Sequence, residues 1–136
     1  MSNRIDLVPK WTRAITGILA LLNILYGSMG YFDLTLLFQN SIGLDLTNPS
    51  LQHASFEFAA RNLAIGLALG IVALKGVPES ITIVTIIRAL VELQTIFISL
   101  STGQVDVKIL MPLVFLAVEI LIIKTMIGVI KNRDSM

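Results

Sequence analysis

Four apolar stretches, each close to twenty residues long, limit most strongly how this chain can fold. They run over Trp11–Tyr31, Ala54–Leu74, Ile81–Leu100 and Ile109–Ile130. An α-helix needs about 20 apolar residues to cross the ~30 Å hydrocarbon core of a bilayer. The alternative, soluble helices buried in a large core, fails because a chain of 136 residues cannot enclose four such helices. We therefore expect residues 1–136 to form a single all-α membrane domain that crosses the bilayer four times.

Composition supports this class and excludes several others. Only 14% of the residues are charged, whereas soluble domains carry roughly a quarter. The net charge of +1 leaves no broad basic face for nucleic acid. The absence of cysteine excludes disulfides and thiolate chemistry, and His53, as the only histidine, excludes a multi-histidine metal site. We expect no metal site, and the residues identify no cofactor.

Prolines and a glycine predict where helices begin and end. Pro9, Pro49 and Pro78 each lie where a helix would start, a position at which the missing N–H does no harm. Gly76 is suited to end the preceding helix, because glycine readily adopts a left-handed backbone. The second helix should therefore run from about Pro49 to Lys75 and extend beyond the hydrocarbon.

The distribution of lysine and arginine predicts the orientation in the membrane. One side would carry six such residues near the span ends and the other only Lys108; the six are Arg4, Lys10, Arg13, Lys75, Lys131 and Arg133. Positive residues are enriched on the cytoplasmic side. We expect an antiparallel four-helix bundle with both termini cytoplasmic and an extracytoplasmic loop, Phe32–His53, between the first and second helices.

Polar side chains recur at similar depth inside the apolar stretches. Seven of them fall within roughly 5 Å of the bilayer midplane at the helical rise of 1.5 Å per residue. They are Asn23 on the first stretch, Arg61 and Asn62 on the second, Arg88, Glu92 and Gln94 on the third, and Glu119 on the fourth. An unpaired charge at this depth costs about 2.5 kcal/mol or more, so these residues form our candidate intramembrane cluster.

Helical spacing predicts how these charges pair. Glu57 with Arg61 and Arg88 with Glu92 are spaced i,i+4, so each pair can share one helix face. Arg61 and Glu92 also lie at similar depth on adjacent helices, and we predict that they pair. Glu119 has no arginine neighbour on its own helix, which makes it the carboxyl group least explained by a local pair.

The cluster supports two interpretations of nearly equal weight. It is either a structural network that fixes helix register or a site for a ligand, a proton or a substrate. Tyr26 lies deeper than the interface and would either hydrogen-bond into the cluster or pack. His53, near the start of the second helix, is expected to be solvated or paired with the loop.

Small residues indicate where helices approach closely. Gly17, Ala20, Gly27 and Gly30 form a rough stripe on the first helix that includes Asn23. On the second helix, Gly66 and Gly70 have the G-x-x-x-G spacing of packed membrane helices. We interpret both patterns as close packing.

Three sequence elements resemble the DoxX-like small four-helix membrane proteins of bacteria, in particular the poorly characterised groups beside DoxX. They are Tyr26-Gly27, the run Phe56–Leu69 (FEFAARNLAIGLAL) and Arg88 followed by Glu92. The resemblance covers nearly the whole chain in layout, although its motifs are short. It implies a four-helix bundle in a bacterial inner membrane and says little about chemistry.

Three functions remain open. The favoured one is a non-catalytic module or accessory subunit, alone or as a homo-oligomer or part of a larger complex in the lipid bilayer. Its polar interior would bind a lipid-like or quinone-like molecule or a partner helix. The second is an enzyme acting on an apolar substrate with Glu92 or Glu119 as acid/base and Arg61 or Arg88 holding an anionic or carbonyl group. Glu57, Arg61 and Asn62 are faintly similar to the membrane-associated eicosanoid and glutathione enzymes. The third is a subunit of an oligomeric transporter or channel.

Overall fold

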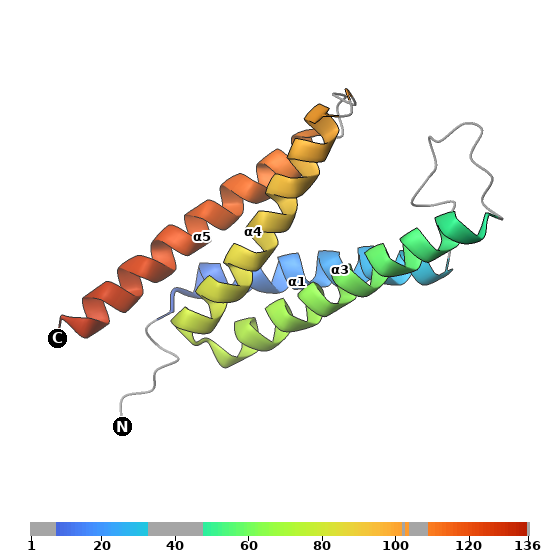
Figure 1. Cartoon of the computed structure of the whole chain (residues 1–136). Coiled ribbons are helices and arrows are strands. Elements are labelled where there is room, and N and C mark those ends of the chain that lie inside the picture. Colours follow the sequence, from blue (N-terminus) through green and yellow to red (C-terminus); the bar gives the residue numbers. More distant parts are fainter. Residues whose placement is uncertain (1–7, 33–47, 102, 104–108, 136) are drawn as a thin grey trace. The chain divides into compact units, whose positions relative to one another are not determined.

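The computed structural model describes residues 8–32, 48–101, 103 and 109–135. These residues form the α-helices α1 (Lys10–Phe32), α3 (Pro49–Lys75), α4 (Pro78–Ser101) and α5 (Leu110–Asp134), and they contain no strand (Figure 1). All four helices are long and apolar enough to cross a membrane. The prediction of an all-helical chain with four candidate membrane spans is confirmed.

The helix ends lie where proline and glycine predict them. Pro49 and Pro78 are the first residues of α3 and α4. Before α3, the Asn48 side chain accepts a hydrogen bond of 2.9 Å from the backbone N–H of Ser50, as an N-cap residue does. After α3, Gly76 has a φ of +62°, and its N–H donates to the carbonyl oxygen of Val72 at 2.9 Å. This left-handed residue ends the helix without the strain that a side chain would add.

The chain divides into two compact units. Unit 2 is Ile15–Ile71, which holds most of α1 and α3. Unit 1 is Met1–Ala14 together with Val72–Met136, which holds α4, α5 and the adjoining ends of α1 and α3. The arrangement of all four helices as one antiparallel bundle, and the single domain over residues 1–136, stay predictions.

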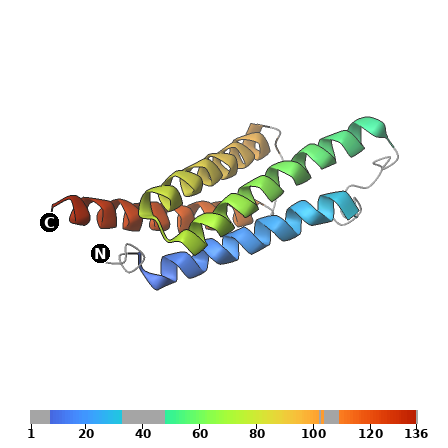
Figure 2. The same cartoon turned by 90° about the horizontal axis from the view of Figure 1, so that it is seen from below.

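In unit 2, α1 and α3 lie side by side and their backbones approach closely at glycines (Figures 1 and 2). A Cβ atom added at Gly27 would lie 2.8 Å from the backbone nitrogen of Leu63. Near the end of α1, the carbonyl oxygen of Gly30 accepts a hydrogen bond of 3.3 Å from Ser55 in the second turn of α3. The two helices therefore run in opposite directions, and the predicted close packing at Gly27 and Gly66 is confirmed.

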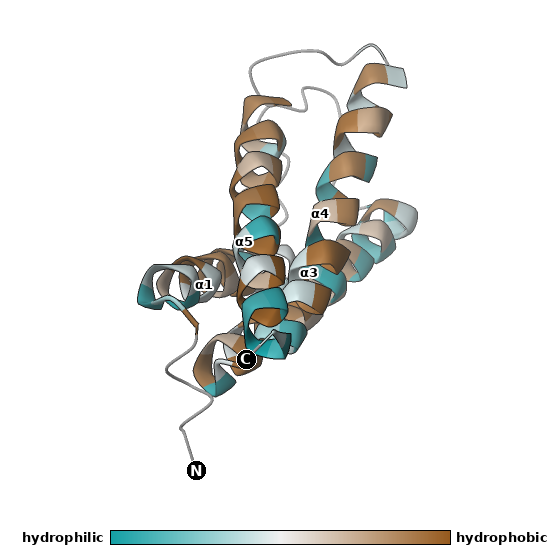
Figure 3. Ribbon diagram, turned by 90° about the vertical axis from the view of Figure 1, so that its left-hand side faces the viewer, coloured by the Kyte–Doolittle hydropathy of each residue, from teal (hydrophilic) through white to brown (hydrophobic). Residues whose placement is uncertain are grey.

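In unit 1, α4 packs against α5. An ion pair of 2.5 Å joins Glu79 in the first turn of α4 to Arg133 in the last turn of α5, so these helices also run in opposite directions. Ile81, Ile122 and Met126 are fully buried in this unit. Many apolar residues of α4 and α5 are exposed. Figure 3 colours much of both helices brown, for hydrophobic residues. Such a surface suits lipid tails.

Candidate functional site

A buried arginine joins α4 to α5. The Arg88 side chain is only 6% exposed, and its Nη2 lies 2.9 Å from Oε1 of Glu92, one turn further along α4. Its Nη1 donates to Oε1 of Glu119, which is fully buried on α5. We call Arg88, Glu92 and Glu119 the charge triad. One guanidinium group thus contacts two carboxyl groups from two helices.

Helix geometry explains how the sequence assembles the triad. Thr85, Arg88 and Glu92 are spaced i, i+3, i+7 and therefore lie on one face of α4. On α5, Phe115 precedes Glu119 by one turn, and the Arg88 guanidinium carbon lies 5.0 Å from the centre of its ring. A cation over an aromatic face is stabilised by about 0.5–2 kcal/mol. Phe115 therefore supplies a favourable apolar wall for the buried charge.

Three polar atoms of this site are buried without a hydrogen-bond partner in the described part of the chain. They are Oγ1 of Thr85, Nε of Arg88 and Oε2 of Glu119. A buried polar atom that loses its partner costs about 1–3 kcal/mol, so atoms of this kind call for an explanation. The three provide one N–H donor, one acceptor oxygen and one hydroxyl group that can act as either.

The structure confirms part of the predicted pairing and corrects another part. Arg88 and Glu92 form the predicted i,i+4 pair. Glu119, for which we predicted no local pair, has its partner on the neighbouring helix. Sequence reasoning missed Phe115, although an aromatic residue one turn from a buried carboxyl group was a usable signal.

On α3 the predicted Glu57–Arg61 pair is not formed. Glu57 instead lies 3.3 Å from Nε2 of His53, one turn earlier, and both side chains are more than 70% exposed. Arg61 is exposed, and its guanidinium carbon lies 5.8 Å from the centre of the Phe58 ring. Asn62 donates to the carbonyl oxygen of Phe58 at 2.8 Å. The His53 ring is therefore paired within its own helix, while Arg61 presents a charge at the centre of an apolar helix.

The remaining candidate residues are Asn23, Tyr26 and Gln94. Asn23 in unit 2 is buried and donates to the carbonyl oxygen of Leu19 at 2.7 Å, whereas Tyr26 is 44% exposed. Gln94 is exposed on α4. Because Arg61 belongs to unit 2 and Glu92 to unit 1, their pairing stays a prediction.

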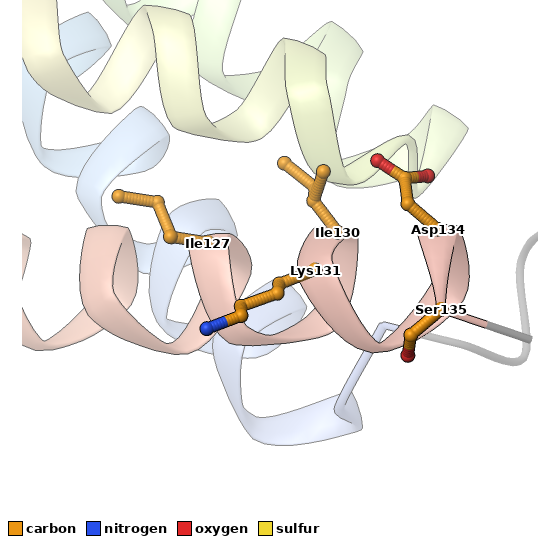
Figure 4. Close-up of a pocket in the computed structure, with 5 residues that line it drawn as sticks. All are labelled: Ile127, Ile130, Lys131, Asp134 and Ser135. Atoms are coloured by element: carbon orange, nitrogen blue, oxygen red, sulfur yellow. The ribbon is translucent and has the colours of Figure 1, made fainter.

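Two open hollows lie on the surface of unit 1. One of about 410 Å³ is formed by the last turns of α5 (Figure 4), and its lining residues are Ile127, Ile130, Lys131, Asp134 and Ser135. The other, of about 640 Å³, lies along α4 and is lined by Leu90, Leu93, Gln94, Phe97 and Ile98. Each hollow is mainly apolar, and none of the three triad residues lines either of them.

Among the described residues, no group of three or more histidine, cysteine, aspartate or glutamate side chains could hold a metal ion. No protein-family model, curated protein or solved structure matches the chain. The resemblance to DoxX-like proteins therefore stays a prediction.

Proposed function

We propose that this protein is a non-catalytic four-helix module of a bacterial inner membrane, acting as an accessory subunit or small oligomer. Its polar intramembrane site would receive a lipid-like or quinone-like molecule, or the polar side chain of a partner helix. The proposal includes an antiparallel bundle with both termini in the cytoplasm and the α1–α3 connection outside. The observation that carries it is the set of unpartnered buried atoms at Thr85, Arg88 and Glu119.

The chemistry of these three atoms suits a neutral molecule that carries carbonyl and hydroxyl groups. The Arg88 Nε–H can donate to a carbonyl oxygen, and Glu119 Oε2 can accept from a hydroxyl group. Quinones, quinols and lipid esters carry such groups on an apolar body. A hydrogen bond to a charged group contributes about 1.5–3 kcal/mol, which is enough to favour such a molecule over plain lipid tails.

The contacts of the triad favour binding over catalysis. An acid/base catalyst needs a carboxyl group within reach of a substrate proton, at a distance of about 2.6–3.2 Å. In this site Glu92 and Glu119 each place one carboxylate oxygen against Arg88. The guanidinium group thus already takes one oxygen of each carboxyl group, and that oxygen is not open to a substrate.

Retention of a small molecule tests this function. The full chain would be purified from bacterial membranes in mild detergent and extracted with organic solvent, and the extract analysed by mass spectrometry. We expect a carbonyl- or hydroxyl-bearing apolar molecule to copurify with the wild type, and its amount to fall several-fold in Thr85→Val, which removes one of the three unpartnered groups.

Thr95→Val is the matched control, because Thr95 lies on the same helix but is exposed and donates to the carbonyl oxygen of Val91. It should retain the molecule at the wild-type level. Equal retention by Thr85→Val and the wild type, or an extract in which no molecule is enriched over its share of the bulk membrane lipid, would count against the proposed site.

Cysteine labelling tests the proposed orientation, and the cysteine-free sequence gives a clean background. Single substitutions Ser2→Cys and Ser135→Cys should be protected from a membrane-impermeant thiol reagent in intact cells, since positive residues hold both ends in the cytoplasm. Ser41→Cys, in the connection between α1 and α3, should react. Labelling of either terminal position in intact cells would reject this topology.

A further inference from the structure

Two carboxyl groups on one guanidinium group leave the triad with an excess negative charge. We propose that Glu92 and Glu119, bridged by Arg88, together bind one exchangeable proton inside the membrane-spanning pair α4–α5. This proton site goes beyond the proposed function, because its first observation, the charge of the triad, is the same with or without a neutral bound molecule. The ligand is a proton from water, and its binding requires no redox partner.

The charge count is the first step. If both carboxyl groups were ionised, one positive and two negative charges would give the triad a net charge of −1. The Glu119 side chain is fully buried and that of Glu92 is only 13% exposed, so water screens this excess charge poorly. An uncompensated charge in hydrocarbon is costly. Binding a proton forms one O–H bond, neutralises one carboxylate and leaves Arg88 balanced by the other.

The unpartnered oxygen of Glu119 is the second, independent observation. Glu119 Oε1 accepts from Arg88, whereas Oε2 is buried with no partner in the described part of the chain. A buried carboxylate oxygen without a donor is far more expensive than the same oxygen in a neutral carboxyl group. Strongly interacting groups titrate as a pair, so the proton belongs to Glu92 and Glu119 jointly.

Among the described residues of unit 1, no cation other than Arg88 forms an ion pair with Glu92 or Glu119. Lys124 is exposed, and its position five residues after Glu119 places it on another face of α5. Glu79 and Arg133 form their own ion pair at the helix ends. Arg13 donates to two backbone carbonyl oxygens at the end of α3. In unit 2, Arg61 lies near the middle of α3. The experiment below tests whether Arg61 supplies a second positive charge to the triad.

Infrared spectroscopy of the full chain in lipid nanodiscs, with ¹³C-labelled glutamate, can detect the proton. At neutral pH the wild type should show a glutamic-acid C=O stretching band that shifts in D₂O. Glu92→Gln and Glu119→Gln should each lose this band, because Arg88 then balances the remaining carboxylate. Arg88→Gln should double the band, since both carboxyl groups then need a proton. Glu57→Gln, at an exposed site, should leave it unchanged.

Three results would overturn the proposal. They are a wild-type spectrum without the band, a band that persists in both glutamine variants, and a band that appears only after Arg61→Gln. The last would show that Arg61 supplies the second positive charge. Circular dichroism would verify that each variant is helical, and the two glutamate variants test the proton even if Arg88→Gln does not fold. Failure of Thr85→Val to change retention of a small molecule would reject the proposed function and leave the proton site standing.

Discussion

Arg88→Leu is expected to lower the free energy of unfolding by about 3–5 kcal/mol, the typical cost of removing one partner of a buried ion pair. Arg88 is buried and contacts both carboxyl groups of the triad, so its loss leaves Glu92 and Glu119 without a cation. It also removes the cation over the Phe115 ring. Thermal or denaturant unfolding in detergent, followed by circular dichroism, measures the loss.

Double and triple variants test whether the network has two members or three. A simple Arg88–Glu92 pair predicts that Arg88→Leu with Glu92→Leu regains most of the stability. The structure instead predicts partial rescue, because Glu119 stays buried without its arginine. Rescue should be nearly complete when Glu119→Leu is added, since well-packed apolar residues often replace a buried ion pair at little cost.

Arg61→Leu is the matched control for loss of an arginine. Arg61 is exposed, and the closest contact described for its guanidinium group is the Phe58 ring. Its replacement should change stability in detergent much less than Arg88→Leu does. Equal effects at the two positions, or full recovery in the double variant, would contradict the three-residue network.

The helix ends could be predicted from sequence because they depend on local backbone chemistry. Proline at Pro49 and Pro78 fixes φ and lacks an N–H, and Gly76 adopts a positive φ at no steric cost. These effects act within a few residues and need no knowledge of neighbouring helices. The lengths of the four apolar segments can likewise be read directly from the sequence, as runs of apolar residues.

The membership of the triad could be predicted only in part. The Arg88–Glu92 pair follows from the fixed geometry of one helix, which spacing alone defines. Contact between Arg88 and Glu119 depends on the rotation of α4 and α5 about their own axes. Because α5 is apolar around most of its circumference, hydrophobic periodicity did not indicate which face packs inward.

On α3, spacing alone gave the wrong partner for Glu57. Both His53 and Arg61 lie four residues away from it, one on each side. The structure selects His53, whereas Arg61 extends over the Phe58 ring. Energies of a few tenths of a kcal/mol for such helical pairs are too small to decide between two partners from sequence.

Gly66→Ala is expected to destabilise unit 2 by about 1–3 kcal/mol, the usual cost of overpacking a tight contact. The added Cβ would lie 2.9 Å from the backbone nitrogen of Ile24 and 3.0 Å from the carbonyl oxygen of Ala20. Both atoms belong to the α1 backbone and cannot rotate away, so α1 and α3 would have to separate. Unfolding in detergent, measured as for Arg88, would reveal the loss.

Gly17→Ala, in the stripe of small residues on α1, provides the opposite expectation. Among the described residues, no atom outside its own stretch of helix lies within 4 Å of a Cβ placed at Gly17. The new methyl group therefore meets no obstacle, and alanine favours a helix over glycine by up to about 1 kcal/mol. We expect unchanged or slightly increased stability. Equal destabilisation by Gly17→Ala and Gly66→Ala would contradict this difference in packing between the two glycines. Gly17 would then also have to pack closely against a neighbouring segment.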